Sequence, residues 1–218
     1  MKIIQASISE YGTTKGNAGD QTGKELNIRE WYSRPWDAVI RYKDSEISNK
    51  AVEIAKILTE SNLVGYSQAD RNSLYKALKN CNFDIKKYIA SGEKTNCDCS
   101  AFVYACYAYI LPRLRNDNNA PTTHTFIDFF DKYEFAIFTN ENFVKTTKNL
   151  LNGDILLSIG KHTAIVYDDS LTMEYSTSVE NALAVLASEV LKGTFGNGEK
   201  RKENIYKAVQ NKVNKLLS

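Results

Sequence analysis

The sequence lacks the features that are typical of membrane, secreted and metal-binding proteins. Its 218 residues include four cysteines and two histidines, and the formal net charge is only +2. No stretch approaches the roughly 20 apolar residues of a membrane span, so we expect no membrane insertion. The N-terminus has a short apolar run without the cleavage site of a secretory signal. We therefore expect a protein that is soluble where it is made, with its cysteines as free thiols.

The cysteines and histidines also lack the spacing of a metal site. Three of the four cysteines lie within CDCSAFVYAC, but only Cys97 and Cys99 are close, as a C-x-C pair. Neither histidine, His124 or His162, falls at the spacing of a zinc motif. We expect no metal and no organic cofactor. The cysteines are then core thiols, or one of them is a nucleophile.

A buried helix is predicted to begin at the second of these cysteines. The segment Cys99–Leu111 has apolar residues at helical spacing, and Pro112 ends it. Cys99 therefore lies at the junction of a polar loop and a helix, where unpaired N–H groups and the helix dipole favour a thiolate. Cys106, two turns further, is predicted to be a core residue.

A nucleophilic cysteine needs a base, and His162 is the candidate. Two β-rich runs, 162–167 and 171–176, are separated by turn formers. If they form a hairpin, His162 lies opposite Glu174, which would accept a hydrogen bond from one ring nitrogen and leave the other for Cys99. The alternative is a half-exposed strand histidine opposite a solvated glutamate.

Three separated motifs resemble the NlpC/P60 family of cysteine peptidases and its phage amidase relatives. They are Asp98-Cys99-Ser100 at a helix start, Gly153-Asp154 before an apolar strand, and His162 followed twelve residues later by Glu174. The resemblance implies an α+β, papain-like fold over residues 1–177, in which the cysteine helix packs on an antiparallel sheet. It implies Cys99, His162 and Glu174 as catalytic residues, although the third position is commonly His, Asn or Gln.

The resemblance also implies the substrate, which is bacterial peptidoglycan. Cys99 would attack an amide carbonyl and form a thioester, and His162 would protonate the leaving amine. A D,L-endopeptidase is expected, with N-acetylmuramoyl-L-alanine amidase as the alternative on the same residues. An acyltransferase and an inactive wall-binding adaptor are more distant possibilities. An endolysin of phage or prophage origin would stay in the host cytoplasm until membrane permeabilisation.

The region before the cysteine helix contains further candidates for substrate contacts. Its order of motifs is similar to that of phage endolysins, which makes Asp20, Trp31 and Tyr32 candidates, although the aromatics could equally be buried. Asp98 and Ser100 are candidates as well, and Asp98 has the alternative role of a helix N-cap. Helices are predicted over 49–61 and 68–79.

The last part of the chain, 182–218, differs in character. It has three helical patterns broken at glycines, and seven Lys or Arg residues against three Glu residues. It lacks the aromatic interleaving or long basic run of a nucleic-acid-binding tail. The pattern resembles the short CW_7-like wall-binding repeat of phage lysins. The resemblance predicts a small three-helix wall-binding unit with contacts from its glycine turn. The candidates are Gly196, Asn197, Gly198 and Arg201.

Overall fold

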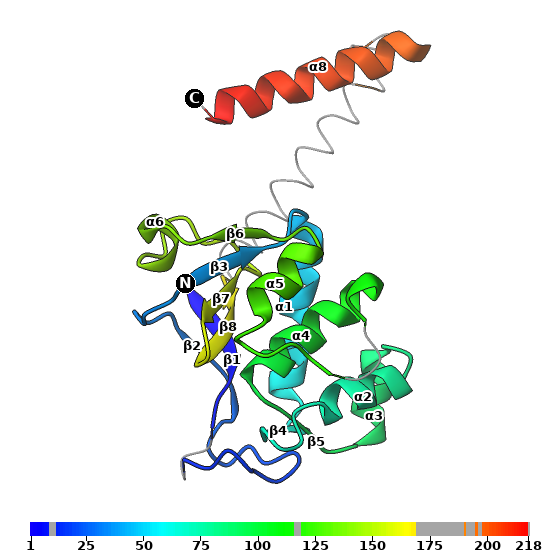
Figure 1. Ribbon diagram of the computed structural model, residues 1–218. Coiled ribbons are helices and arrows are strands. Elements are labelled where there is room, and N and C mark those ends of the chain that lie inside the picture. Colours follow the sequence, from blue (N-terminus) through cyan, green and yellow to red (C-terminus); the bar gives the residue numbers. More distant parts are fainter. Residues whose placement is uncertain (9–11, 116–118, 169–189, 191–194, 196–197, 218) are drawn as a thin grey trace. The chain divides into compact units, whose positions relative to one another are not determined.

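A computed structural model of the chain describes residues 1–8, 12–115, 119–168, 190, 195 and 198–217. The chain divides into two compact units, Met1–Asp169 and Ser170–Ser218. In the first unit, a sheet lies on one side and most of the helices pack on the other (Figure 1).

The main sheet has six strands in the order β2-β1-β8-β7-β3-β6, and every neighbouring pair is antiparallel. A second sheet is the parallel pair of β4 and β5. The strands of the main sheet are β1 (Lys2–Ala6), β2 (Leu26–Glu30), β3 (Ala38–Arg41), β6 (Ala136–Phe138), β7 (Ile155–Ser158) and β8 (His162–Tyr167). The smaller sheet contains β4 (Val64–Tyr66) and β5 (Thr95–Cys97).

The helices of the first unit include two long ones that pack on each other and on the sheet, α1 (Ser45–Glu60) and α4 (Cys99–Ile110). The shorter ones are α2 (Ser73–Asn80), α3 (Ile85–Ser91), α5 (Phe126–Lys132), α6 (Glu141–Val144) and the 3₁₀ turn η1 (Pro112–Leu114). The predicted start of the first helix at 49 is too late, because the Asp44 carboxylate caps the helix by accepting from the N–H groups of Glu46 and Ile47.

The central strands are buried on both faces. Every residue of β7 and β8 is buried. Alternate side chains such as Ile165 face the large core under α1 and α4, and the others, such as Val166, join a smaller cluster around Trp36. A strand that is covered on both sides needs apolar residues at every position, which explains the unbroken runs ILL and TAIVY.

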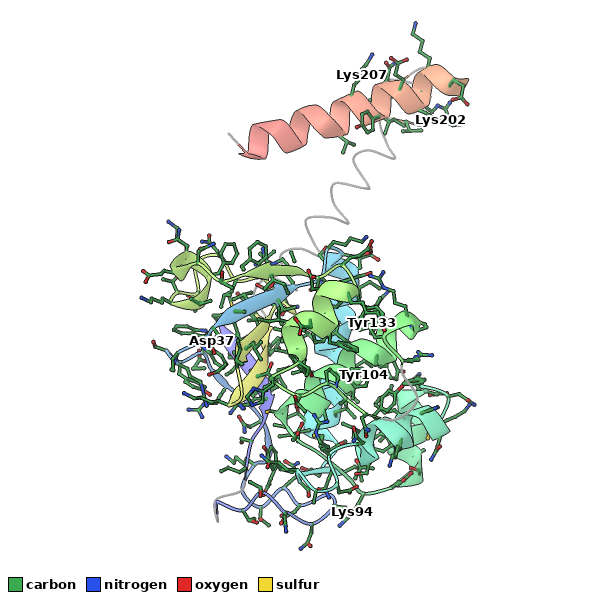
Figure 2. The ribbon with its side chains drawn as sticks, in the orientation of Figure 1. Asp37, Lys94, Tyr104, Tyr133, Lys202 and Lys207 are labelled. Atoms are coloured by element: carbon green, nitrogen blue, oxygen red, sulfur yellow. The ribbon has the colours of Figure 1, made fainter. Side chains whose placement is uncertain are left out.

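The cysteine helix forms as predicted, but it is buried around its whole circumference. Its first ten residues, Cys99 to Ala108, are all buried between the sheet and neighbouring helices. Tyr104, labelled in Figure 2, lies in this helical layer and donates its hydroxyl to the Leu114 carbonyl at 3.0 Å. The helix ends at Ile110, before Leu111 and Pro112, because proline cannot continue it.

The strand that begins at His162 pairs with different strands from the one that the sequence predicts. Strand β8 has the predicted bounds, and it pairs with β7 so that His162 lies opposite Ser158. The other edge of β8, which the predicted hairpin required, pairs with the N-terminal strand β1 over Ile165–Tyr167. Glu174 lies outside the described residues.

The described part of the second unit contains one long helix, α8 (Gly198–Leu217). Gly198–Lys202 are therefore helical, although the sequence pattern predicts a turn there. The ammonium groups of Lys202 and Lys207, labelled in Figure 2, lie 2.8 and 2.6 Å from carboxylate oxygens one turn before them, on Glu199 and Glu203. The predicted three-helix arrangement falls mostly outside the described residues.

Candidate active site

Cys99 is the first residue of α4, directly after the residue that caps the helix. The Asp98 carboxylate accepts a hydrogen bond from the Ala101 N–H at 2.7 Å, which confirms the predicted N-cap. Cys99 is 7% exposed. Its helix packs on β8, and the backbone N–H of Thr163, the residue after His162, is close enough to lower the pKa of the Cys99 thiol. The fold thus joins the head of the helix to the first residues of the strand.

Burial decides the charge state of this cysteine. Burial raises the pKa of the Cys99 thiol to about 11, and the adjacent Asp98 carboxylate acts in the same direction. The N–H groups of Thr163 and Ser100 and the guanidinium of Arg71 lower this pKa, but by less. The resting group is a thiol, which differs from the thiolate that the helix N-terminus alone would favour.

His162 is held by groups that the sequence motifs do not contain. Its Nε2 lies 2.9 Å from Oε1 of Gln5, a residue of β1, and its ring stacks near Trp36 with centroids 6.2 Å apart. The Gln5 amide nitrogen donates to Asn27, and the Tyr32 hydroxyl donates to Gln5 Oε1, so the amide oxygen faces the imidazole. An acceptor at Nε2 places the ring proton there and leaves the Nδ1 lone pair available.

The environment also keeps the imidazole neutral. Burial lowers the pKa of His162 to about 4, and the nearby guanidinium groups of Arg34 and Arg29 lower it further. The side chain is 8% exposed. In these protonation states the Cys99 thiol can donate a proton and the His162 imidazole can accept one.

Arg71 holds the head of α4 in place. Its Nε and Nη2 donate to the two carboxylate oxygens of Asp98 at 2.6 and 3.2 Å, and Nη2 also donates to Ser100 Oγ at 2.7 Å. The same guanidinium donates to the carbonyls of Ala120 and Pro121. It therefore ties the segment before α2, the cysteine helix and the 120–121 segment together at one point.

A cleft of about 390 Å³ opens beside His162. Its walls come from β1, β2, β4 and the start of β8, and from residues in the segments that follow β1, β2, β4 and β7. The lining residues include Gln5, Arg29, Tyr32, Arg34, Tyr66, Lys161 and His162. Burial, and then the neighbouring Cys99, raise the pKa of Tyr66 to about 12, so its hydroxyl stays protonated at neutral pH.

Comparison with known families gives two matches. The sequence model of the endolysin-like domain matches residues 3–173, which is more than half of the chain. The chain belongs to the endolysin-like domain family. The model of the CW_7 repeat matches residues 185–217. No curated protein and no solved structure matches the chain. The family indicates a cell-wall lytic protein, and the repeat indicates binding to the cell wall.

Two of the predicted substrate contacts in the endolysin-like domain are occupied by the protein itself. The Asp98 and Ser100 side chains both bond to Arg71, and Ser100 Oγ also donates to Asp98 at 2.9 Å. Asp20 does not line the cleft. Its carboxylate closes a turn by accepting from Thr22, and this loop packs so closely on β4 that a Cβ at Gly65 would lie 2.9 Å from the Asp20 nitrogen.

The two aromatic residues of the endolysin-like domain that are predicted to contact the substrate lie in different places. Tyr32 lines the cleft, and its ring faces the guanidinium of Arg29 at 4.6 Å. Trp31 packs instead against the apolar cluster on the outer face of the sheet. His124 is exposed, and its ring contacts the turn between β7 and β8, where a Cβ at Gly160 would lie 2.6 Å from it.

Two other cysteines of the endolysin-like domain, Cys97 and Cys106, are buried in its interior. All four cysteines are free thiols. Cys106 is buried in the core, as predicted, and Cys97 is buried in β5 with its sulfur 3.9 Å from the Gly65 carbonyl. Within the described ranges, no three His, Cys, Asp or Glu side chains gather as metal ligands would. No helix in that same part of the chain is long and apolar enough to cross a membrane.

The acid limb of the pH profile tests the charge state of His162. If His162 acts as the base, we expect kcat/KM on a soluble muropeptide to persist below pH 6.5 and to fall with a midpoint near 4, where this histidine becomes protonated. Because the folded pKa is depressed, the unfolded chain binds this proton first, so stability also declines as pH falls from 6.5 towards 4.

Circular dichroism at each pH separates the two effects, because titration of the base in the folded protein leaves the spectrum unchanged. A midpoint at or above 6.5, with the fold intact, would contradict the buried, neutral imidazole.

Proposed function

We propose that the endolysin-like domain hydrolyses an amide bond in the stem peptide of peptidoglycan through a cysteine thioester. The observation that carries the proposal is the packing of α4 on β8. Cys99 begins α4, which packs on the strand that begins with His162, and His162 Nε2 lies 2.9 Å from Gln5 Oε1. A nucleophile, a base and an orienting group in this order form the common arrangement of cysteine hydrolases.

The proposed reaction has two steps. His162 Nδ1 takes the thiol proton while Cys99 Sγ attacks the carbonyl carbon, and the backbone N–H of Cys99 stabilises the oxyanion. The C–N bond then breaks, and the imidazolium gives its proton to the leaving amine. In the second step His162 removes a proton from water, which attacks the thioester and releases the acid and the free thiol. The reaction needs no metal and no cofactor.

We propose a D,L-endopeptidase of NlpC/P60-like, papain-like architecture. The supporting features are the helix-borne cysteine, the antiparallel sheet that carries the histidine, and the motif order Asp98-Cys99-Ser100, Gly153-Asp154 and His162. The test is digestion of purified peptidoglycan followed by mass spectrometry of the fragments. New amino termini inside the stem peptide are expected. Release of intact stems with free L-Ala would mean an amidase instead.

For the C-terminal repeat we propose wall binding through residues 182–218. The match to the CW_7 repeat supports this role. Gly198 and Arg201 lie in the first turn of α8 and stay candidate contacts, while Gly196 and Asn197 lie outside the described residues.

The third catalytic position has two candidates, Gln5 and Glu174. Gln5 is the candidate that contacts His162 in the described part of the chain, and it is one of the residue types common at this position in the resembled family. We expect Gln5→Leu to lower kcat/KM by about 10-fold to 100-fold, because the ring proton loses its acceptor. Gln5→Glu is expected to raise the acid limb of the pH profile, because a carboxylate at Nε2 stabilises the imidazolium.

Glu174→Gln is the matched variant for this comparison. A normal rate and acid limb in both Gln5 variants, with a large loss in Glu174→Gln, would assign the position to Glu174. Thermal melts of each variant separate a loss of orientation from a loss of fold.

A further inference from the structure

The cleft beside His162 has basic residues in its wall and, among the residues the structure describes, no acidic ones. The basic residues are Arg29, Arg34 and Lys161. A pocket with cationic walls attracts an anionic ligand and disfavours a cationic one. The charge of this cleft therefore bears on which part of a substrate can occupy it.

Two of these cations are held in position but have no ionic partner within the described part of the chain. The guanidinium carbon of Arg29 lies 4.6 Å from the Tyr32 ring centroid, and that of Arg34 lies 5.8 Å from the centroid of Trp36. Stacking on a ring face leaves the N–H edge of a guanidinium free to bind a ligand.

The other arginines of the first unit form hydrogen bonds with groups of the protein itself. Arg41 donates to both carboxylate oxygens of Asp154, and Arg71 does the same with Asp98. Arg113 bonds to Glu134, and Arg115 donates to backbone carbonyls. Arg29 and Arg34 thus stand apart, and both line the cleft.

We propose that Arg29 and Arg34 form a carboxylate-binding subsite that selects the stem peptide by a free carboxylate close to the scissile bond. The planar fork of a guanidinium matches a carboxylate with two parallel hydrogen bonds. Lys161 adds positive charge at the same cleft. This inference rests on the proposed function, because it names the substrate group that the same site recognises.

The proposed subsite lies close to His162, so a carboxylate bound there would affect the proposed base. Arg34 packs on Trp36, and Trp36 stacks near His162, so a carboxylate bound there lies close to the imidazole. The positive charges of Arg34 and Arg29 help to depress the pKa of His162. A bound carboxylate offsets these charges and makes the imidazole a stronger base when the substrate is in place.

Two groups in a stem peptide supply such a carboxylate. One is the α-carboxylate of the D-glutamate that is linked through its side chain, and the other is the carboxylate at the C-terminus. The test uses four synthetic muramyl tetrapeptides, in which each carboxylate is either free or amidated. The full chain is assayed with each, and kcat/KM is measured by mass spectrometry of the products.

We expect the wild type to prefer a free carboxylate at one of the two positions by about 10-fold to 100-fold over its amide. The position that shows the preference identifies the source. The double variant Arg29→Gln, Arg34→Gln is expected to cleave acid and amide at similar rates. Arg34→Lys is expected to keep part of the preference, because it retains the charge but not the fork.

The control is Arg113→Gln, which removes an arginine that bonds Glu134 and Tyr42 and does not line the cleft. It should keep the full preference. Equal rates on all four peptides by the wild type, or an unchanged preference in the double variant, would overturn the subsite and leave the proposed function standing. If the wild type cleaves none of the peptides, the proposed function fails and the subsite with it.

Discussion

Cys99→Ala is expected to abolish the release of fragments from peptidoglycan, with a fall in turnover of at least about 10⁴-fold. The thioester cannot form without the sulfur, and the neighbouring Ser100 hydroxyl is engaged by Arg71 and Asp98. Clearing of a wall suspension and mass spectrometry of the soluble fraction both measure the loss.

The variant should fold normally, because alanine is a good helix former at a buried first-turn position. Cys81→Ala is the matched control. Cys81 is a half-buried thiol that caps the C-terminus of α2, outside both sheets, and its loss should leave turnover unchanged. If Cys99→Ala still lyses walls, the cysteine mechanism is wrong. If neither it nor the wild type releases fragments while both bind walls, the adaptor alternative gains support.

Arg71→Met is expected to lower the free energy of unfolding by about 3–5 kcal/mol, the range for removing one partner of a buried ion pair. The side chains of Arg71 and Asp98 are only 15% and 12% exposed, so the substitution leaves a largely buried carboxylate without its counter-charge. It also removes donors from two backbone carbonyls and Ser100. Urea denaturation, with the midpoint and slope fitted together, measures the change.

Three further variants separate the causes of this loss. Adding Asp98→Asn to Arg71→Met removes the unpaired charge and should recover part of the stability. Arg71→Lys keeps the charge but not the fork, so it should lie between wild type and Arg71→Met. Arg113→Met removes an exposed arginine and should have little effect. A loss in Arg71→Met no larger than in Arg113→Met would contradict the anchoring role of Arg71.

The sequence singles out the two proposed reacting residues, Cys99 and His162, because each lies at the end of an element with a strong local pattern. The apolar run after Cys99 and its stop at Pro112 define α4, and the β-rich run of His162–Tyr167 gives β8 with its observed bounds. Asp98 is recognisable as a cap from its position alone. These predictions depend on residues that are neighbours in the chain.

The supporting residues are not predictable in this way, because their partners are distant in the sequence. Gln5 meets His162 across 157 positions, and Arg71 meets Asp98 across 27. Gln5 stands in an apolar strand, and Arg71 stands in a turn before α2, within the segment 68–79 that the sequence predicts as a helix. Their roles follow from the order of strands in the sheet, in which β1 lies beside β8.

The same strand order determines when the site can form. Strand β1 is made first, yet it pairs with β2 on one side and with β8, the last strand of the main sheet, on the other. Contacts between such distant segments form late and slowly, because the intervening chain must first be ordered. On the ribosome, Cys99 and its helix are complete before the strand that carries His162 has emerged. A nascent chain therefore cannot bring the proposed catalytic pair together until nearly the whole first unit has been translated.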